Sequence, residues 1–282
     1  IRPDRTPMRI RISHATTYHY DTPPKSVTQV LRLTPRNHDG QYVCNWRIDL
    51  SRDCQLHQRD GGFGNVSHSF TAEGPFDELS VTVEGEVDTQ DTNGIVSGAV
   101  ERFPPAMFLR ESPLTEPDAA IIALADDTRD KAGADPLNLM HALMLAINDT
   151  MEFDTDPTQV TTTAAEAFAL RRGVCQDGTH IFIAAARHLG VPARYISGHF
   201  YRADDVTAQD AGHAWAEAYI EKLGWVGFDP TNGISPTEAH VRVAVGLDYL
   251  GAAPVRGTRY GGSGESLKVA VNVAQAGWQS QS

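Results

Sequence analysis

Residues 8–90 alternate between apolar and polar positions with a period of two, the pattern of β-strands that bury one face. Turn-rich residues 60–65 (Asp-Gly-Gly-Phe-Gly-Asn) predict a hairpin connection. Short strands separated by turns predict an all-β sandwich or barrel. The strands expected are residues 8–13, 27–33, 42–50 and 79–84.

Glycines and prolines break the periodicity between residues 91 and 117, and we place a domain boundary there, near residue 105. Beyond it the apolar spacing becomes helical. Three helices are predicted, beginning after the capping residues Thr115, Asp135 and Thr163 and ending near Gly133, Met151 and Gly173.

The next stretch, Gly173 to Gly190, predicts a glycine turn followed by a cysteine and an apolar helix of about four turns. Cys175 therefore lies at or next to a helix N-terminus. Free amide N–H groups and the helix dipole stabilise a thiolate there and suit an oxyanion. A cysteine among alanines is more often a small buried hydrophobe, so a catalytic role for Cys175 depends on partners elsewhere in the chain.

Those partners are predicted on a hairpin, since the period returns to two after the helix. We expect it to turn near Glu221, midway between His213 and Asp229, so that these two residues lie opposite each other or one step off register. A carboxylate there fixes the imidazole tautomer and leaves the other ring nitrogen for Cys175. Taken singly, His213 is more simply a hydrogen-bonded core histidine, and Asp229 an Asp-Pro turn residue. Strands are expected at residues 193–200, 212–220 and 225–230.

Three motifs closely resemble those of the bacterial transglutaminase-like family of papain-like cysteine enzymes. They are Gly-Val-Cys-Gln-Asp at 173–177, Gly-His-Ala-Trp-Ala-Glu at 212–217 and Trp-Val-Gly-Phe-Asp-Pro-Thr-Asn-Gly at 225–233. Residues 8–23 and 248–257 resemble the start and the C-terminal segment of that family. The resemblance implies that Cys175 is the nucleophile, His213 the base and Asp229 the residue that orients it.

The implied fold class is α+β. An N-terminal sandwich-like domain (8–105) precedes a papain/transglutaminase-like catalytic domain (106–275), in which the cysteine helix packs on an antiparallel sheet. The sequence departs from the family at Gly178, where a bulky residue is more usual, and at Leu247, where arginine is expected. Animal transglutaminases use an upstream tryptophan for the oxyanion, but no tryptophan lies between Trp46 and Trp215. The backbone N–H of Cys175 is a candidate donor, and a second donor is unassigned.

The implied activity is thiol-based acyl transfer on peptide or glutamine-type amide bonds, with hydrolysis favoured and no cofactor. One alternative is a true transglutaminase with an amine acceptor, and another is a non-catalytic peptide-binding module. A metal site formed by Cys175, Asp177, His180 and His213 is disfavoured. Cys175 and His180 do not share a helix face, and no zinc-type or Ca²⁺-loop spacing is present.

Composition narrows the partners of the 282-residue chain. A net charge of −12 argues against nucleic acid and anionic membranes as partners. The family resemblance implies a protein or peptide substrate, and the oligomeric state stays open. No apolar run reaches the roughly 18–20 residues of a membrane helix, and no signal peptide is visible. The cysteines are Cys44, Cys54 and Cys175, an odd count that favours a reducing cytoplasm. Cys44 is expected to be a packed core thiol.

Overall fold

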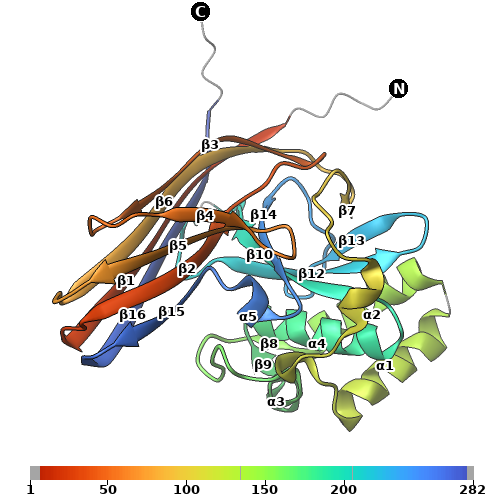
Figure 1. The fold of residues 1–282 in the computed structure, drawn as a ribbon. Coiled ribbons are helices and arrows are strands. Elements are labelled where there is room, and N and C mark those ends of the chain that lie inside the picture. Colours follow the sequence, from red (N-terminus) through yellow and green to blue (C-terminus); the bar gives the residue numbers. More distant parts are fainter. Residues whose placement is uncertain (1–6, 134, 205, 278–282) are drawn as a thin grey trace, which may run out of the picture.

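The computed structural model describes residues 7–277, except 134 and 205. Two antiparallel sheets form the β-rich part of the molecule (Figure 1). One has the strand order β11-β16-β1-β6-β3 and the other β15-β2-β5-β4. Their strands are β1 (Met8–Thr22), β2 (Ser26–Thr34), β3 (Gln41–Leu50), β4 (His57–Asp60), β5 (Val66–Glu73), β6 (Glu78–Thr89), β11 (Ala208–Gln209), β15 (Val255–Tyr260) and β16 (Ser263–Gln275).

The apolar alternation positions the core of this sandwich. Alternate residues of β6, namely Leu79, Val81 and Val83, are fully buried and pack with Leu31 of β2 and Phe70 of β5. The hairpin predicted at residues 60–65 is confirmed, because Asp60 pairs with Val66 across it. The sequence pattern therefore predicted an all-β region correctly, and of the sandwich and the barrel that it left open the structure forms the sandwich.

The C-terminal strands join the sheets built by the first ninety residues. β16 pairs along β1 from Ile10↔Gln275 to Thr22↔Ser263, and β15 pairs with β2. Figure 1 shows these blue strands beside the red strands from the start of the chain. A domain division at residue 105 stays a prediction, but residues 255–275 pair with the N-terminal strands.

The third sheet carries the helices and has the order β14-β10-β12-β13-β7. Helix α4 packs on β12 and β10 through a core that includes Ile183, Ala214 and Ala216. The strands are β7 (Ile95–Val96), β10 (Ala193–Phe200), β12 (His213–Ile220), β13 (Gly224–Phe228) and β14 (His240–Gly246). The helices are α1 (Ala119–Ala132), α2 (Pro136–Thr150), α3 (Ala164–Leu170), α4 (Cys175–His188) and α5 (Tyr249–Ala252), with 3₁₀ turns at Pro105–Leu109 and Pro113–Thr115 and a short parallel pair, β8 (Glu152–Phe153) with β9 (Arg172–Gly173).

Two helix ends differ from the sequence prediction. Asp118, not Thr115, caps α1, because its carboxylate accepts the Ile121 N–H while Thr115 lies in a 3₁₀ turn. Helix α3 ends at Arg171 in the left-handed conformation, and Gly173 then pairs with Phe153. At each of these ends, a residue closer to the helix than the predicted one pairs with its free backbone groups: Asp118 accepts an N–H of α1, and Arg171 donates its N–H to carbonyls of α3.

The expectation that Cys44 is a packed core thiol is wrong. A bulge between Val43 and Asn45 shifts the register of the edge strand β3, and the partly exposed Cys44 sulfur lies 3.9 Å from the Tyr42 carbonyl oxygen. A bulge changes which face a side chain occupies, and the sequence pattern gave no sign of it. Within residues 7–277, positions 134 and 205 aside, no helix is both long and apolar enough to cross a membrane.

Candidate active site

Cys175 is the first residue of α4, as predicted, and its side chain is partly exposed. Val174 caps the helix, and its N–H donates to the Asp177 carboxylate at 2.8 Å. Thr158 donates to the same carboxylate oxygen at 2.7 Å, which links the preceding loop to this helix end. Gly173 leaves room for that carboxylate, since a Cβ there would lie 2.4 Å from it. The first turn that carries Cys175 is therefore held on two sides.

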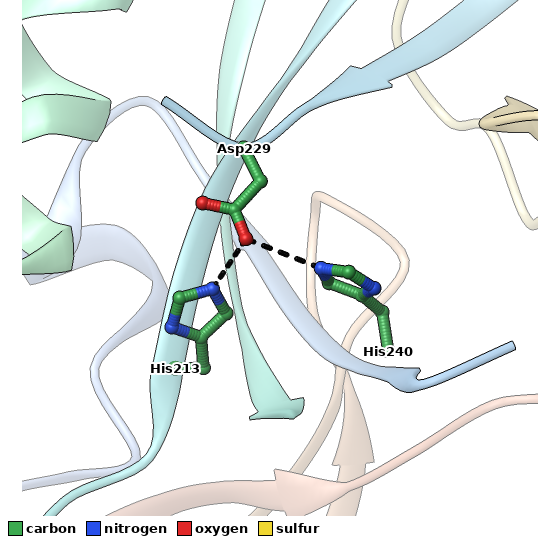
Figure 2. Close-up of side chains that lie close together, drawn as sticks. All are labelled: His213, Asp229 and His240. Atoms are coloured by element: carbon green, nitrogen blue, oxygen red, sulfur yellow. Dashed lines mark hydrogen bonds and ion pairs between the residues drawn. The ribbon is translucent and has the colours of Figure 1, made fainter. Parts of the chain in front are cut away.

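His213 and Asp229 meet at the open end of the β12–β13 hairpin. His213 Nε2 lies 2.7 Å from Asp229 Oδ2, and the aspartate is fully buried (Figure 2). The hairpin is centred on Lys222, one residue beyond the predicted Glu221, because Ile220 pairs with Gly224 across a three-residue loop. Asp229 is therefore a diagonal neighbour of His213 rather than its direct partner. The side chains bridge that offset.

The Asp229 carboxylate is held by several donors. Its Oδ1 accepts the backbone N–H groups of Thr231 and Asn232 at 3.1 and 3.2 Å. Its Oδ2 accepts the Asn232 side-chain amide at 2.6 Å, in addition to His213. Asn148 of α2 fixes the loop by donating to the carbonyls of Pro230 and Thr231. Five donors converge on the two oxygens when His240 is included.

The pair is strongly polarised. Burial lowers the pKa of His213, but the charge and hydrogen bond of Asp229, together with a hydrogen bond and charge from Cys175, outweigh it and raise the pKa to about 10. Burial also opposes the charged form of Asp229, yet attraction to His213 and hydrogen bonds from both histidines hold its pKa well below the usual range. Because Nε2 faces Asp229, Nδ1 is the ring nitrogen left for Cys175. The contact of His213 with Asp229 and the hydrogen bond and charge that Cys175 exerts on His213 bring the three predicted residues into one cluster.

His240, which the sequence did not single out, completes this cluster. It is buried at the start of β14, and its Nε2 lies 3.2 Å from Asp229 Oδ2. His213, Asp229 and His240 offer ligand-type atoms within 4.8 Å of one another, a spacing at which a metal ion could bind. However, His240 Nδ1 accepts the Thr237 N–H at 3.1 Å, so Nε2 carries the ring proton and has no lone pair for a metal. These three residues are therefore better suited to hydrogen bonds with one another than to holding a metal ion.

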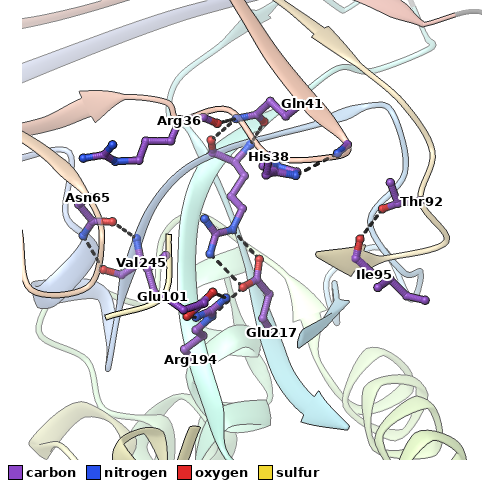
Figure 3. Close-up of polar contacts among 12 residues, drawn as sticks. Arg36, His38, Gln41, Asn65, Thr92, Ile95, Glu101, Arg194, Glu217 and Val245 are labelled. Carbon is purple, nitrogen blue, oxygen red and sulfur yellow. Dashed lines mark hydrogen bonds and ion pairs between the residues drawn. The ribbon is translucent and has the colours of Figure 1, made fainter. Parts of the chain in front are cut away.

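Behind the site lies a buried charge cluster that crosses three strands. Glu217 of β12 accepts from Arg194 of β10 and Arg242 of β14, each at 2.7 Å, and Arg194 also binds Glu101 (Figure 3). Burial opposes the charge on Glu217, but both guanidinium groups outweigh it and lower its pKa to about 2. Arg194 also stacks on Trp225, 3.7 Å from the ring centre.

The remaining residues named in the sequence motifs and in the disfavoured metal site take part in packing and backbone hydrogen bonds. Trp215 and Trp225 are buried with Phe108 and Ile196 on the sheet face opposite α4, where they are core aromatics. His180 is buried within α4 and accepts the Tyr249 N–H at 3.0 Å. Asp177 caps the start of α4 by accepting the Val174 N–H.

Comparison with known families matches residues 122–230 to the transglutaminase-like superfamily and residues 10–88 to the bacterial transglutaminase-like N-terminal region. An uncharacterized Mycobacterium tuberculosis protein is 30% identical over 94% of this chain and 92% of its own length. An uncharacterized Mycobacterium leprae protein is 28% identical over 95% of this chain and 99% of its own. A Pseudomonas aeruginosa protein-glutamine gamma-glutamyltransferase is 27% identical over 56% of this chain and 26% of its own length.

Among solved structures, a Cytophaga hutchinsonii protein described as a "putative cysteine protease" superposes with a TM-score of 0.75. The match covers 98% of this chain and 93% of that one at 20% identity. At that identity it supports the fold: an α+β molecule with an N-terminal β domain and a helix-bearing antiparallel sheet.

Proposed function

The chain belongs to the transglutaminase-like superfamily. From this premise we propose that it is a thiol acyl-transfer enzyme with Cys175 as the nucleophile, His213 as the base and Asp229 as the carboxylate that orients His213. The observation that carries the proposal is the His213–Asp229 contact of 2.7 Å beside a cysteine at a helix N-terminus. A raised His213 pKa favours an imidazolium, and an imidazolium beside the sulfur stabilises the thiolate.

The proposed reaction has two halves. The Cys175 thiolate attacks an amide carbonyl, the carbon–nitrogen bond breaks, and His213 gives its proton to the leaving amine. Water then attacks the thioester, passing a proton to His213 as the carbon–sulfur bond breaks. The free N–H groups at the start of α4 are suited to the developing oxyanion.

We propose hydrolysis as the second half, with peptide or glutamine-type amides as substrates. Water is always available to the acyl-enzyme, and no lysine-binding site is identified among the described residues. The alternative, transfer to an amine, is favoured by the Pseudomonas aeruginosa relative, which is named a protein-glutamine gamma-glutamyltransferase. A non-catalytic peptide-binding module remains the second alternative. The acyl-enzyme itself is common to both enzymatic outcomes.

Mass spectrometry of glutamine-containing peptides distinguishes these functions. Peptides are incubated with the protein, with and without a primary amine, and with Cys175→Ser as the matched control. We expect conversion of glutamine to glutamate or cleavage of the chain, and a thioester adduct on Cys175. A peptide–amine conjugate would show transfer, whereas binding without any covalent product would favour the peptide-binding module.

A further inference from the structure

His240 gives the carboxylate of Asp229 a second histidine partner. Figure 2 shows the two rings approaching the same carboxylate oxygen from different strands. His213 Nε2 is 2.7 Å from Asp229 Oδ2, and His240 Nε2 is 3.2 Å from it. We propose that His240 is a positioning residue, which donates a hydrogen bond from its neutral ring to Asp229 and thereby aims the carboxylate at His213. The inference rests on the proposed function for its catalytic meaning.

The tautomer of His240 follows from its partners. Its Nδ1 faces the backbone N–H of Thr237 at 3.1 Å, so that nitrogen must supply a lone pair. The proton is then on Nε2, which points at Asp229. Burial lowers the pKa of His240 and outweighs the opposing effect of Asp229, with repulsion from His213 in the same direction. His240 is therefore neutral where His213 is cationic, although the two share one oxygen.

Aromatic packing fixes the plane of the His240 ring. The Phe200 ring lies 4.7 Å from His240 and 5.3 Å from His213, so one side chain contacts both histidines. Trp215 packs edge-on against His240 at 5.2 Å. Close packing on two sides keeps the donor aimed at Asp229, because rotation of the ring would require these neighbours to move.

Among the residues that the structure describes, the carboxylate on the far side of His240 is already paired with arginines. His240 borders a cavity of about 40 Å³ whose titratable lining groups are His38, Glu217 and Arg242. Glu217 is already paired with Arg194 and Arg242. His213 and Asp229 contact His240 from the other side. Within the described part of the chain, the His240 ring thus has two hydrogen-bond partners, the Thr237 N–H and the Asp229 carboxylate.

The test separates the two hydrogen bonds of His240 with a matched pair of variants. In His240→Gln the longer side chain places an amide N–H near the position of Nε2, which keeps the donor to Asp229. In His240→Asn the shorter side chain keeps an acceptor near the position of Nδ1 for Thr237 but does not reach Asp229. Each variant loses one bond, so similar melting temperatures are expected.

We expect His240→Asn to slow iodoacetamide alkylation of Cys175 at pH 7 by about 10- to 100-fold, since a small misplacement of the aligned groups has effects of this order. His240→Gln is expected to stay within about threefold of wild type. In His240→Asn alone, the fall of the alkylation rate in acid is expected to occur at a higher pH, because Asp229 has lost a donor that keeps it ionised. His188→Asn is the control: it breaks a histidine–aspartate contact with Asp126 at the other end of α4.

Equal rates in the two His240 variants would overturn the proposal. A second readout needs no variant, because ¹⁵N chemical shifts of the histidines report the tautomer directly. We expect His240 in the Nε2–H form at pH 7, and a proton on Nδ1 would contradict the assignment. Both measurements are independent of turnover. If no amide substrate is ever processed while both hold, the proposed function fails and the positioning role stands.

Discussion

At the scale of single residues, the charge on Asp229 decides the state of His213. Burial alone disfavours the imidazolium, and the charge and hydrogen bond of the carboxylate reverse that preference. The donors around Asp229 are backbone and side-chain N–H groups that stabilise its ionised form. The arrangement supports a cationic His213 at neutral pH, which is the state that a thiolate at Cys175 requires.

Replacing Asp229 by asparagine removes this charge while keeping a similar shape. We expect the pKa of His213 to fall by roughly 1–3 pH units, the usual effect of losing an adjacent opposite charge. The change is measured by NMR titration of the His213 ring in wild type and Asp229→Asn. An unchanged titration would mean that Asp229 does not control the imidazole.

At the scale of elements, the buried ion cluster joins β10, β12 and β14 behind the candidate site. Glu217 and Arg194 are almost completely buried, and Arg242 is nearly so. Such a cluster contributes little net free energy relative to apolar packing, but breaking one partner leaves uncompensated buried charge. The strands that carry His213 and His240 therefore depend on Glu217.

Glu217→Gln is expected to lower the free energy of unfolding by about 3–5 kcal/mol, measured by urea denaturation. The control is Glu86→Gln, which breaks the ion pair with the largely exposed Arg11 and is expected to cost less than about 1 kcal/mol. A loss from Glu217→Gln no larger than that of the control would contradict the account of the cluster.

The elements also show how far the sequence leads. Periodicity and capping residues predict β6, α2, α4 and the β12–β13 hairpin, because local patterns determine them. The pairing of β16 with β1 brings together segments about 250 residues apart, and local patterns carry no such information. The role of His240 could not be predicted for the same reason, because nothing around it in the chain indicates that β14 lies near Asp229. The bulge at Cys44 could not be predicted, because a prediction from alternating residues treats the strand as regular.

At the scale of the whole molecule, two buried histidines meet where the sandwich contacts the helix-bearing sheet. His14 of β1 and His199 of β10 pack edge-on with ring centres 5.6 Å apart. Burial lowers the pKa of His14 to about 4, and burial with repulsion from His14 and His213 lowers that of His199 to about 3. Both therefore stay neutral in the folded state at pH values where the unfolded chain protonates them.

This difference predicts a loss of stability in acid. The pKa of each histidine in the folded state lies below its unfolded value of about 6.5. The free energy of unfolding is therefore unaffected by these histidines above pH 6.5 and declines as the pH falls toward 4. In His199→Gln the slope of unfolding free energy against pH is expected to fall by up to about 1.4 kcal/mol per pH unit in that window. Chemical denaturation at several pH values measures it. His57→Gln, at an exposed position on β4, is the control, and an equal slope change there would contradict the assignment.

The central claim is that His213 and Asp229 activate Cys175, and the most direct measurement is the pH dependence of Cys175 alkylation by iodoacetamide. Wild type, His213→Ala and Cys175→Ser are compared, with the last correcting for reaction at Cys44 and Cys54. We predict fast alkylation of wild type well below the free thiol range of about pH 8.5, and its loss in His213→Ala. A rate and pH profile unchanged by His213→Ala would contradict the account.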